Sequence, residues 1–306
     1  MSHPHVISFF ENDQEELWIS TFGGGLNYFN PATDQWKHYQ ANAGNKGASN
    51  RPSTIFRTEQ DQFWIASYGD GLYLFDPQTE VFKNFNHDPN NPNSLSHNIV
   101  CPILADQTGT IWVGGNKGLL NRFDRETEQF ERISLGAHVW GLSDMVMDEN
   151  GWFWIGSGEG LIHFNPQNYA FQIYTNVPND SKSLSLSHVY TLHLDQQQQL
   201  WIGTAGGGLN LLLDAEKGIF KKYRTADGLP NDVVYAIEPD EAGYFWLTTN
   251  QGISRFDPNA ALFSTSMLTT VYRIMNLING LFFTIRPPKE CLRVGSTVLI
   301  FFTQIA

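Results

Sequence analysis

The chain alternates short apolar runs with short polar turns, and the same order of runs recurs along most of its length. Each copy begins with an apolar run such as NIVCPILAD (Asn98 to Asp106), followed by a polar turn such as DQTG. A Trp-containing run such as LWIGT (Leu200 to Thr204) comes next, and a Gly-rich turn leads into an alternating run such as GLNYFNP. Runs of this length, rich in β-branched and aromatic residues and bounded by Gly, Asn, Asp and Pro, predict antiparallel hairpins. No segment longer than one strand has helical periodicity.

The spacing of the Trp position predicts the architecture. This position is occupied by Trp18, Trp64, Trp112, Trp154, Trp201 and Trp246, so the intervals are 46, 48, 42, 47 and 45 residues. Such an interval is the length of a four-stranded propeller blade. We therefore predict an all-β fold, a β-propeller of four-stranded antiparallel blades with six recognisable blades within residues 1–260.

Each Gly-rich turn raises the question of whether its glycines serve the fold or a ligand. LWIGTAGGGLN (Leu200 to Asn210) places three glycines directly after a bulky strand. A turn that needs positive φ, or two backbones that approach closely, requires glycine. We interpret these glycines as architectural.

The repeat stops after residue 260. Residues 261–306 contain no Trp and no Asp, and they carry four basic residues against one acid. One permitted codon series for Val294 to Gln304, shifted by two nucleotides, reads GVNGFNIFYP, which has the spacing of another blade strand. We expect this non-repeat tail to be a frame-shifted seventh blade, so that the seventh blade is damaged or incomplete; a genuine C-terminal domain is the alternative.

Composition excludes several classes of protein. The formal net charge is −12, which disfavours binding to nucleic acid. Two cysteines cannot form a disulfide framework. No export signal, membrane-length apolar run, metal-ligand spacing or cofactor motif is evident, and we expect no cofactor and no metal.

The repeated motif resembles the two-component regulator propeller family. The resemblance rests on LWIGTAGGGLN, on IFKKYRTADGLPNDVV (Ile219 to Val234), and on SLSHNIV and SLSHVY at the entries to two first strands. It implies the periplasmic sensor of a hybrid histidine kinase or related signalling protein, from which this chain is a fragment. A downstream β-sandwich, a membrane helix and a signalling module usually follow in that family; none is recognisable here. The resemblance also implies an oligosaccharide ligand and allows a homodimer.

Candidate ligand-binding residues occupy the entry to each first strand and the turn between second and third strands. In a propeller these two segments face the same mouth of the central channel. The candidates are Arg51, Tyr68, His97, Asn98, His138, Trp140, His188 and Tyr190. Aromatic faces with fixed polar groups suit a sugar ligand.

Other interpretations of these residues stay open. His97 and His188 occupy equivalent repeat positions, so each could cap a turn or bridge two blades instead of binding a ligand. Trp140 and Arg51 depart from the repeat, which favours a functional role. Two further functions remain as alternatives: a protein–protein interaction scaffold, and a propeller lyase or glycosidase. No paired acids stand out from the turn residues, so we expect no catalysis in this chain.

Overall fold

The structure is a computed structural model that describes residues 2–3, 5–12, 14–40, 49–58, 61–265 and four short strands between 275 and 299. The chain divides into two compact units. Unit 1 is built on residues 1–134 and unit 2 on residues 135–273, and short C-terminal segments are shared between them. Within the described residues the fold is all-β, with one 3₁₀ turn, η1 (Thr225–Asp227).

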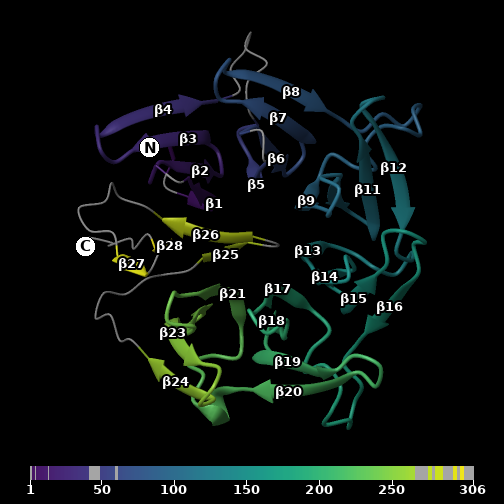
Figure 1. Ribbon diagram of the computed structural model, residues 1–306, viewed down its shortest axis with the longest axis vertical. Helices are drawn as coiled ribbons and strands as arrows, with labels where there is room; N and C mark the ends of the chain where they lie inside the picture. The colour runs from purple at the N-terminus through teal and green to yellow at the C-terminus, as the bar shows by residue number, and fades with distance from the viewer. Residues whose placement is uncertain are drawn as a thin grey trace. The chain divides into compact units, whose positions relative to one another are not determined.

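Unit 1 contains three sheets, each built from four consecutive antiparallel strands (Figure 1). The first is formed by β1 (His5–Glu11), β2 (Leu17–Thr21), β3 (Gly25–Asn30) and β4 (Gln35–Tyr39). The second is formed by β5 (Pro52–Arg57), β6 (Phe63–Ser67), β7 (Leu72–Asp76) and β8 (Val81–Phe85). The third is formed by β9 (Val100–Ala105), β10 (Ile111–Gly115), β11 (Leu119–Asp124) and β12 (Gln129–Ser134).

Unit 2 contains three further sheets of the same kind. The fourth is formed by β13 (Leu142–Met147), β14 (Phe153–Ser157), β15 (Leu161–Phe164) and β16 (Phe171–Tyr174). The fifth is formed by β17 (Val189–Leu194), β18 (Leu200–Thr204), β19 (Leu209–Asp214) and β20 (Ile219–Tyr223). The sixth is formed by β21 (Val234–Pro239), β22 (Phe245–Thr249), β23 (Gly252–Asp257) and β24 (Leu262–Thr265). The prediction of six four-stranded antiparallel blades is confirmed.

The segment after residue 265 is described only as backbone strands. These are β25 (Met275–Leu277), β26 (Gly280–Thr284), β27 (Leu292–Val294) and β28 (Thr297–Leu299). In unit 1, β26 pairs antiparallel with β1, so β25 and β26 extend the first sheet to six strands. The sixth blade ends at Thr265, past the boundary expected at residue 260. The remainder of the tail, including Cys291, lies outside the described residues, and the frame-shift hypothesis stays a prediction.

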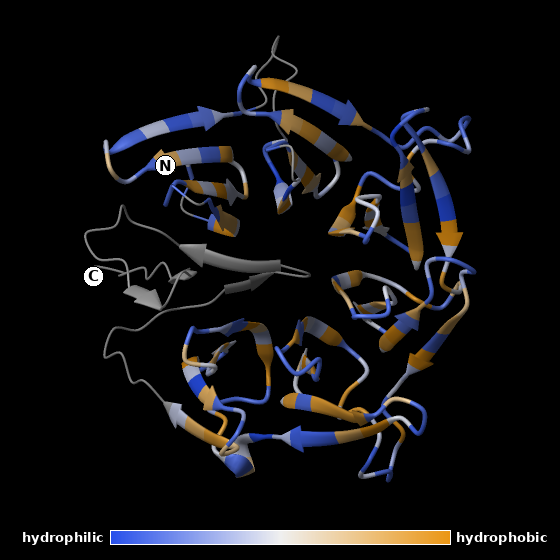
Figure 2. Ribbon diagram, in the orientation of Figure 1, coloured by the Kyte–Doolittle hydropathy of each residue, from blue (hydrophilic) through white to orange (hydrophobic). Residues whose placement is uncertain are grey.

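The second strand of each blade forms the core. In β2, β6, β10, β14 and β18 every residue is buried, whereas the fourth strands β4 and β8 are mostly exposed. Trp112 and Trp201 are each only 1% exposed. Strands covered on both faces have near-continuous apolar sequences, and Figure 2 shows the polar residues gathered on the outer strands.

The Asp of the turn before the Trp strand fixes this core. Asp195 Oδ1 accepts hydrogen bonds from Gln197 N (2.9 Å) and Gln199 N (2.8 Å), while Oδ2 accepts one from Trp201 Nε1 (2.9 Å). Asp106 and Asp240 bind Trp112 and Trp246 in the same way. A buried indole N–H needs a partner, and this Asp supplies it.

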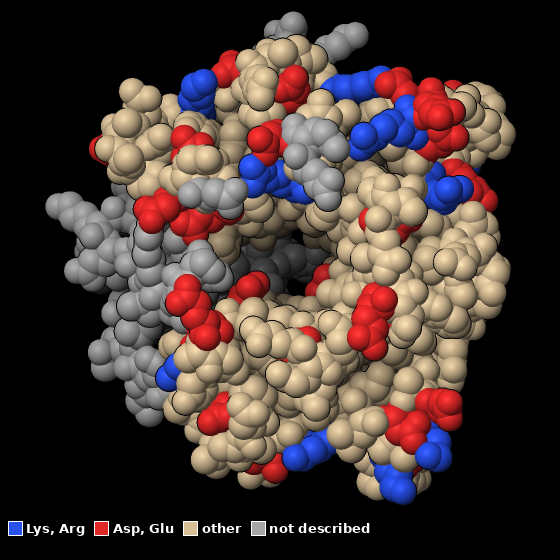
Figure 3. Space-filling model, viewed as in Figure 1, with Lys and Arg blue, Asp and Glu red and all other residues tan. Residues whose placement is uncertain are grey.

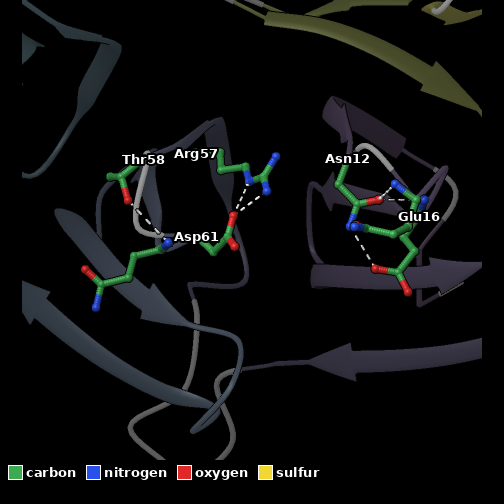
Figure 4. A network of polar contacts seen from close by, with 7 residues as sticks. Asn12, Glu16, Arg57, Thr58 and Asp61 are labelled. Carbon is green, nitrogen blue, oxygen red and sulfur yellow. Dashed lines mark hydrogen bonds and ion pairs between the residues drawn. The ribbon is translucent and has the colours of Figure 1, made fainter.

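The first two blades build the corresponding turn with other residues (Figure 4). In the first blade Asn12 Nδ2 donates to Glu16, 2.8 Å away. In the second, Arg57 forms an ion pair with Asp61. The turn is therefore kept in both blades although the Asp–Trp contact is not.

The glycines of LWIGTAGGGLN (Leu200 to Asn210) serve the backbone, as the sequence predicted. Gly208 has φ of +83°, and a Cβ there would lie 2.2 Å from the carbonyl oxygen of Tyr223 on the neighbouring strand. The adjacent Asn210 is fully buried, and its Oδ1 accepts a hydrogen bond from Ser185 N at 3.0 Å. The motif therefore ties the third strand to the entry segment of the same blade.

Every blade has a register shift near the start of its first strand. In unit 2 the shifts lie between Leu142 and Asp144, between Val189 and Thr191, and between Val234 and Ala236. Unit 1 has shifts at the corresponding places. Each shift leaves one residue of the first strand unpaired in the ladder, or two in the second and third blades, and such β-bulges redirect side chains.

Candidate functional site

Entry segments and second turns lie against each other within single blades, as the sequence analysis expected. Tyr68 N donates to Arg51 O at 2.9 Å, and Ala205 N donates to His188 O at 3.0 Å. Gly158 N donates to Trp140 O at 3.0 Å. Backbone hydrogen bonds thus hold the two kinds of predicted segment together in the second, fourth and fifth blades.

Four aromatic side chains of unit 2 form a continuous line of ring contacts, which we call the aromatic row. Trp140 and His188 have ring centroids 5.4 Å apart, and His188 and Tyr190 are 4.8 Å apart, both with edge-to-face geometry. Tyr190 stacks on Tyr235 at 5.2 Å with 24° between the ring planes. The fourth, fifth and sixth blades each contribute to the row. Such contacts prefer these offset and edge-to-face geometries.

Trp140 is the exposed end of the aromatic row, with 42% of its surface accessible. Its Nε1 donates to Glu159 Oε1 at 2.6 Å. The indole packs on Gly158, where an added Cβ would lie 2.6 Å from the ring. A carboxylate and a bare backbone therefore fix the orientation of a ring that leaves much of its surface open to solvent.

The opposite end is fixed by Tyr235, whose hydroxyl donates to Asn250 Oδ1 at 2.8 Å. Burial raises the pKa of Tyr190 and Tyr235, so both are neutral phenols at physiological pH. Burial also lowers the pKa of His188, although the nearby Glu159 opposes this shift. His188 is therefore mainly neutral near pH 7, and the row acts as a set of uncharged rings.

The bulges explain why the two tyrosine rings come together. Tyr190 and Tyr235 are the residues skipped by the register shifts of β17 and β21. The fourth blade has Ser143 at this position, and its Oγ donates to Val189 O of the next blade at 2.8 Å. Ser53 of unit 1 does the same toward Val100 O at 3.2 Å. Two successive tyrosines replace this serine contact with a stacked pair of rings.

Sequence reasoning found three of the four rings and missed Tyr235. Glu159 and Asn250, which bind the ends of the row, lie in the turns that were expected to face a ligand. Comparison of the repeats position by position could have identified Tyr235, because it lies eleven residues before Trp246 as Tyr190 does before Trp201. His138, also a candidate, is exposed and lies against Gly136; among the described residues no ring contact joins it to the row.

The four candidates of unit 1 form a different arrangement. Asn98 O accepts hydrogen bonds from Gly69 N and Gly71 N at 3.0 and 2.9 Å, and its Oδ1 accepts one from His87 N at 2.6 Å. His97 Nδ1 accepts one from Ile99 N at 2.9 Å. His97 and Asn98 therefore shape the turn, which is the structural role left open for His97.

Arg51 and Tyr68 lie beside this turn. Arg51 is exposed, and its guanidinium lies over Gly69, with Nη2 3.7 Å from the position of a Cβ there. Burial raises the pKa of the Tyr68 hydroxyl, and the Cys101 thiol contributes. The prediction that all eight candidates face one channel mouth is not tested, because four belong to unit 1 and four to unit 2.

Charge and metal chemistry add little to the site. Acidic and basic side chains are interspersed on the face shown in Figure 3. Among the described residues, no group of His, Cys, Asp and Glu side chains could hold a metal ion. The same part of the chain has no helix long and apolar enough to cross a membrane.

Comparisons with known proteins agree with the repeat analysis. Residues 183–206 and 228–251 match the family described as two component regulator propeller. No curated protein sequence matches the chain.

Several solved structures are similar in fold. The extracellular domain assigned to the hybrid two component system BT3049 from B. thetaiotaomicron is 19% identical, with a TM-score of 0.72 over 94% of this chain and 41% of that one. The extracellular domain assigned to the one component system BT4673 from B. thetaiotaomicron is also 19% identical, with a TM-score of 0.55 over 85% and 40%. This chain thus spans about two fifths of their length.

A propeller enzyme is also similar in fold. Virginiamycin B lyase from Staphylococcus aureus is 11% identical, with a TM-score of 0.65 over 85% of this chain and 83% of the enzyme. Likeness at these levels of identity establishes a fold and no more. The chain has the fold of a β-propeller, and two of its repeats match the two component regulator propeller family.

Proposed function

We propose that this chain is the ligand-sensing propeller of a two-component-type signalling protein, that it acts in the periplasm, and that it binds an oligosaccharide at the aromatic row. The observation that carries the proposal is the exposed, firmly oriented indole of Trp140 at the end of four contacting rings. Sugar rings present C–H faces that pack on aromatic rings, while their hydroxyls need fixed polar groups, and Glu159 and Asn250 supply carboxylate and amide oxygens.

The comparisons support the sensory part of this proposal. The repeats match the regulator propeller family, and two proteins of similar fold are extracellular domains of signalling systems. In the full-length protein a downstream β-sandwich and signalling module would receive the signal, through movement of one domain against the next or through formation of a homodimer.

Binding without catalysis is part of the proposal. A general acid or base must reach the substrate with a free nitrogen or carboxylate. His188 makes edge-to-face ring contacts with Trp140 and Tyr190, and Glu159 Oε1 accepts a hydrogen bond from Trp140 Nε1. We therefore assign both side chains a contact role in the aromatic row.

Calorimetric titration of the chain with a panel of neutral and acidic oligosaccharides tests the proposal. Losing one stacking ring costs about 1.5 kcal/mol, so we expect Trp140→Ala to weaken binding by about 10-fold. The matched control is Phe171→Ala, because Phe171 is 39% exposed on the outer strand β16 of the same blade. Equal affinity in wild type and Trp140→Ala would contradict the proposal, and so would the absence of binding across the whole panel.

A further inference from the structure

A cavity of about 720 Å³ opens in unit 1 among the turns of the second and third blades. Its walls include Phe56 and Arg57 at the end of β5, Thr110 before β10, and Arg122 and Phe123 on β11. Figure 4 shows Arg57 and Thr58 beside the turn of the second blade. This volume is within the range that holds small organic ligands.

At one wall of the cavity the third blade has a small side chain at a position where the fourth and sixth blades have a large ring. Thr110 lies two residues before Trp112, and the corresponding residues of the fourth and sixth blades are Trp152 and Tyr244. Trp152 packs on His163 with ring centroids 4.7 Å apart. Thr110 has no ring with which to fill that volume.

The sixth blade shows how this position is filled when an arginine is present. Arg255 pairs across the strands with Trp246, as Arg122 does with Trp112. The guanidinium of Arg255 lies 3.6 Å from the ring centroid of Tyr244. Its Nη2 also donates to Asp240 Oδ2 at 3.1 Å. Arg255 thus has both a stacking ring and a carboxylate.

Arg122 has no stacking ring and no carboxylate as close as those that contact Arg255. Its guanidinium lies 6.0 Å from the ring centroid of Trp112. Its Nη1 is 3.4 Å from Glu131 Oε2, and each side chain of that pair is 48% exposed. An exposed ion pair contributes little, so a ligand can displace it readily.

Two of the three carboxylates in the cavity wall are already used by the fold, and the third belongs to Glu126. Asp106 accepts hydrogen bonds from Thr108 and from the backbone N–H of Thr110, as well as from Trp112 Nε1. Asp124 accepts the N–H groups of its own turn. Arg57, which is paired with Asp61, and Arg125 also line the cavity, together with the apolar rings of Phe56 and Phe123.

We infer that this cavity binds a small aromatic anion. The ring of the ligand occupies the volume that Tyr244 fills in the sixth blade and stacks against the Arg122 guanidinium, while its negative group pairs with Arg122 and Arg125. The inference is independent of the aromatic row, which belongs to unit 2.

Fluorescence titration of the full chain with 8-anilinonaphthalene-1-sulfonate tests the inference, with N-phenyl-1-naphthylamine as the uncharged counterpart. We expect saturable binding of the sulfonate at one site. Thr110→Tyr places a ring in the cavity and should weaken both probes by about 10-fold or more. Arg122→Gln should weaken the sulfonate by about 10-fold, because both the stacking contact and the charge pair are lost, and the uncharged probe by only about 3-fold, because it loses the stacking contact alone.

The matched control is Arg255→Gln, because Tyr244 already fills the equivalent place in the sixth blade. This variant should bind both probes as the wild type does. The inference is overturned if the sulfonate does not bind saturably, or if Thr110→Tyr and Arg122→Gln both retain wild-type affinity. Thermal unfolding shows whether each variant is folded; should Thr110→Tyr not fold, the contrast between the two probes in Arg122→Gln decides.

Discussion

The contact between Asp195 and Trp201 offers a direct test of how the blades are stabilised. Replacing Asp195 by Asn retains an acceptor for the turn but places an amide N–H₂ where Oδ2 accepts from Trp201 Nε1 at 2.9 Å. Trp201 is 1% exposed, so its indole N–H then has no partner and little access to water. An unsatisfied buried donor costs about 1–3 kcal/mol, and we expect Asp195→Asn to lower the free energy of unfolding by about 2 kcal/mol.

Asp195→Ala removes the turn contacts as well. Gln197 N and Gln199 N lose their acceptor, but both belong to an exposed turn where water replaces it, so each adds at most about 0.5–1 kcal/mol. The expected total is about 3 kcal/mol.

Urea unfolding followed by far-ultraviolet circular dichroism measures these changes, and Trp201→Phe supplies the control. Phe has no indole N–H, so the cost of Asp195→Asn should fall by about 1–2 kcal/mol in the Trp201→Phe background. A cost below about 0.5 kcal/mol in the wild-type background, or equal costs in both backgrounds, would refute the reasoning.

Three further predictions concern single positions. Asn210→Ala should lower the free energy of unfolding in urea by about 2 kcal/mol, because Ser185 N loses its buried acceptor. Ser254→Ala, at the same position of the sixth blade, should leave the free energy of unfolding nearly unchanged, because Ser254 Oγ has no hydrogen-bond partner among the described residues. Burial raises the pKa of Asp144 to about 6, although hydrogen bonds to its carboxylate oppose the shift, so ionisation of this group destabilises the fold as pH rises from about 4 to 6. The unfolding free energy of Asp144→Asn relative to wild type should therefore increase by about 2 kcal/mol between pH 4.5 and 7.5. A difference in unfolding free energy that stays constant over this pH range would contradict the prediction. Gly158→Ala should weaken any ligand bound at the aromatic row, since its Cβ would displace the Trp140 indole, and calorimetry with a ligand found for the wild type would detect the change.

The repeat made the blades predictable because its constraints are local. Every blade must bury a Trp strand between two neighbours, and must turn tightly after it, so residues such as Trp201 and Gly208 recur at fixed spacing. The end of the sixth blade was harder to locate. Its last strand, β24, keeps one aromatic residue, Phe263, but lacks the basic residue and the second aromatic residue of most other fourth strands, and it was assigned to the tail.

The candidate site was only partly predictable because its residues act across blades. Trp140 and Tyr190 were recognised as candidates, but the contact of Tyr190 with Tyr235 joins residues 45 positions apart in the sequence. His97 and Asn98 have the same residue types as a binding site would, yet their hydrogen bonds serve the turn. Distinguishing these cases requires the partner of each polar atom, which composition and spacing do not reveal.

The bulge near the start of each first strand has an evolutionary consequence. A residue outside the ladder can change from Ser to Tyr without shifting the register of the strands that follow. Ser143, Tyr190 and Tyr235 show such exchange within one chain. Duplication of a blade therefore copies the scaffold together with one position that strand pairing does not constrain. Successive blades can change the side chain at this position while the inherited core is left intact.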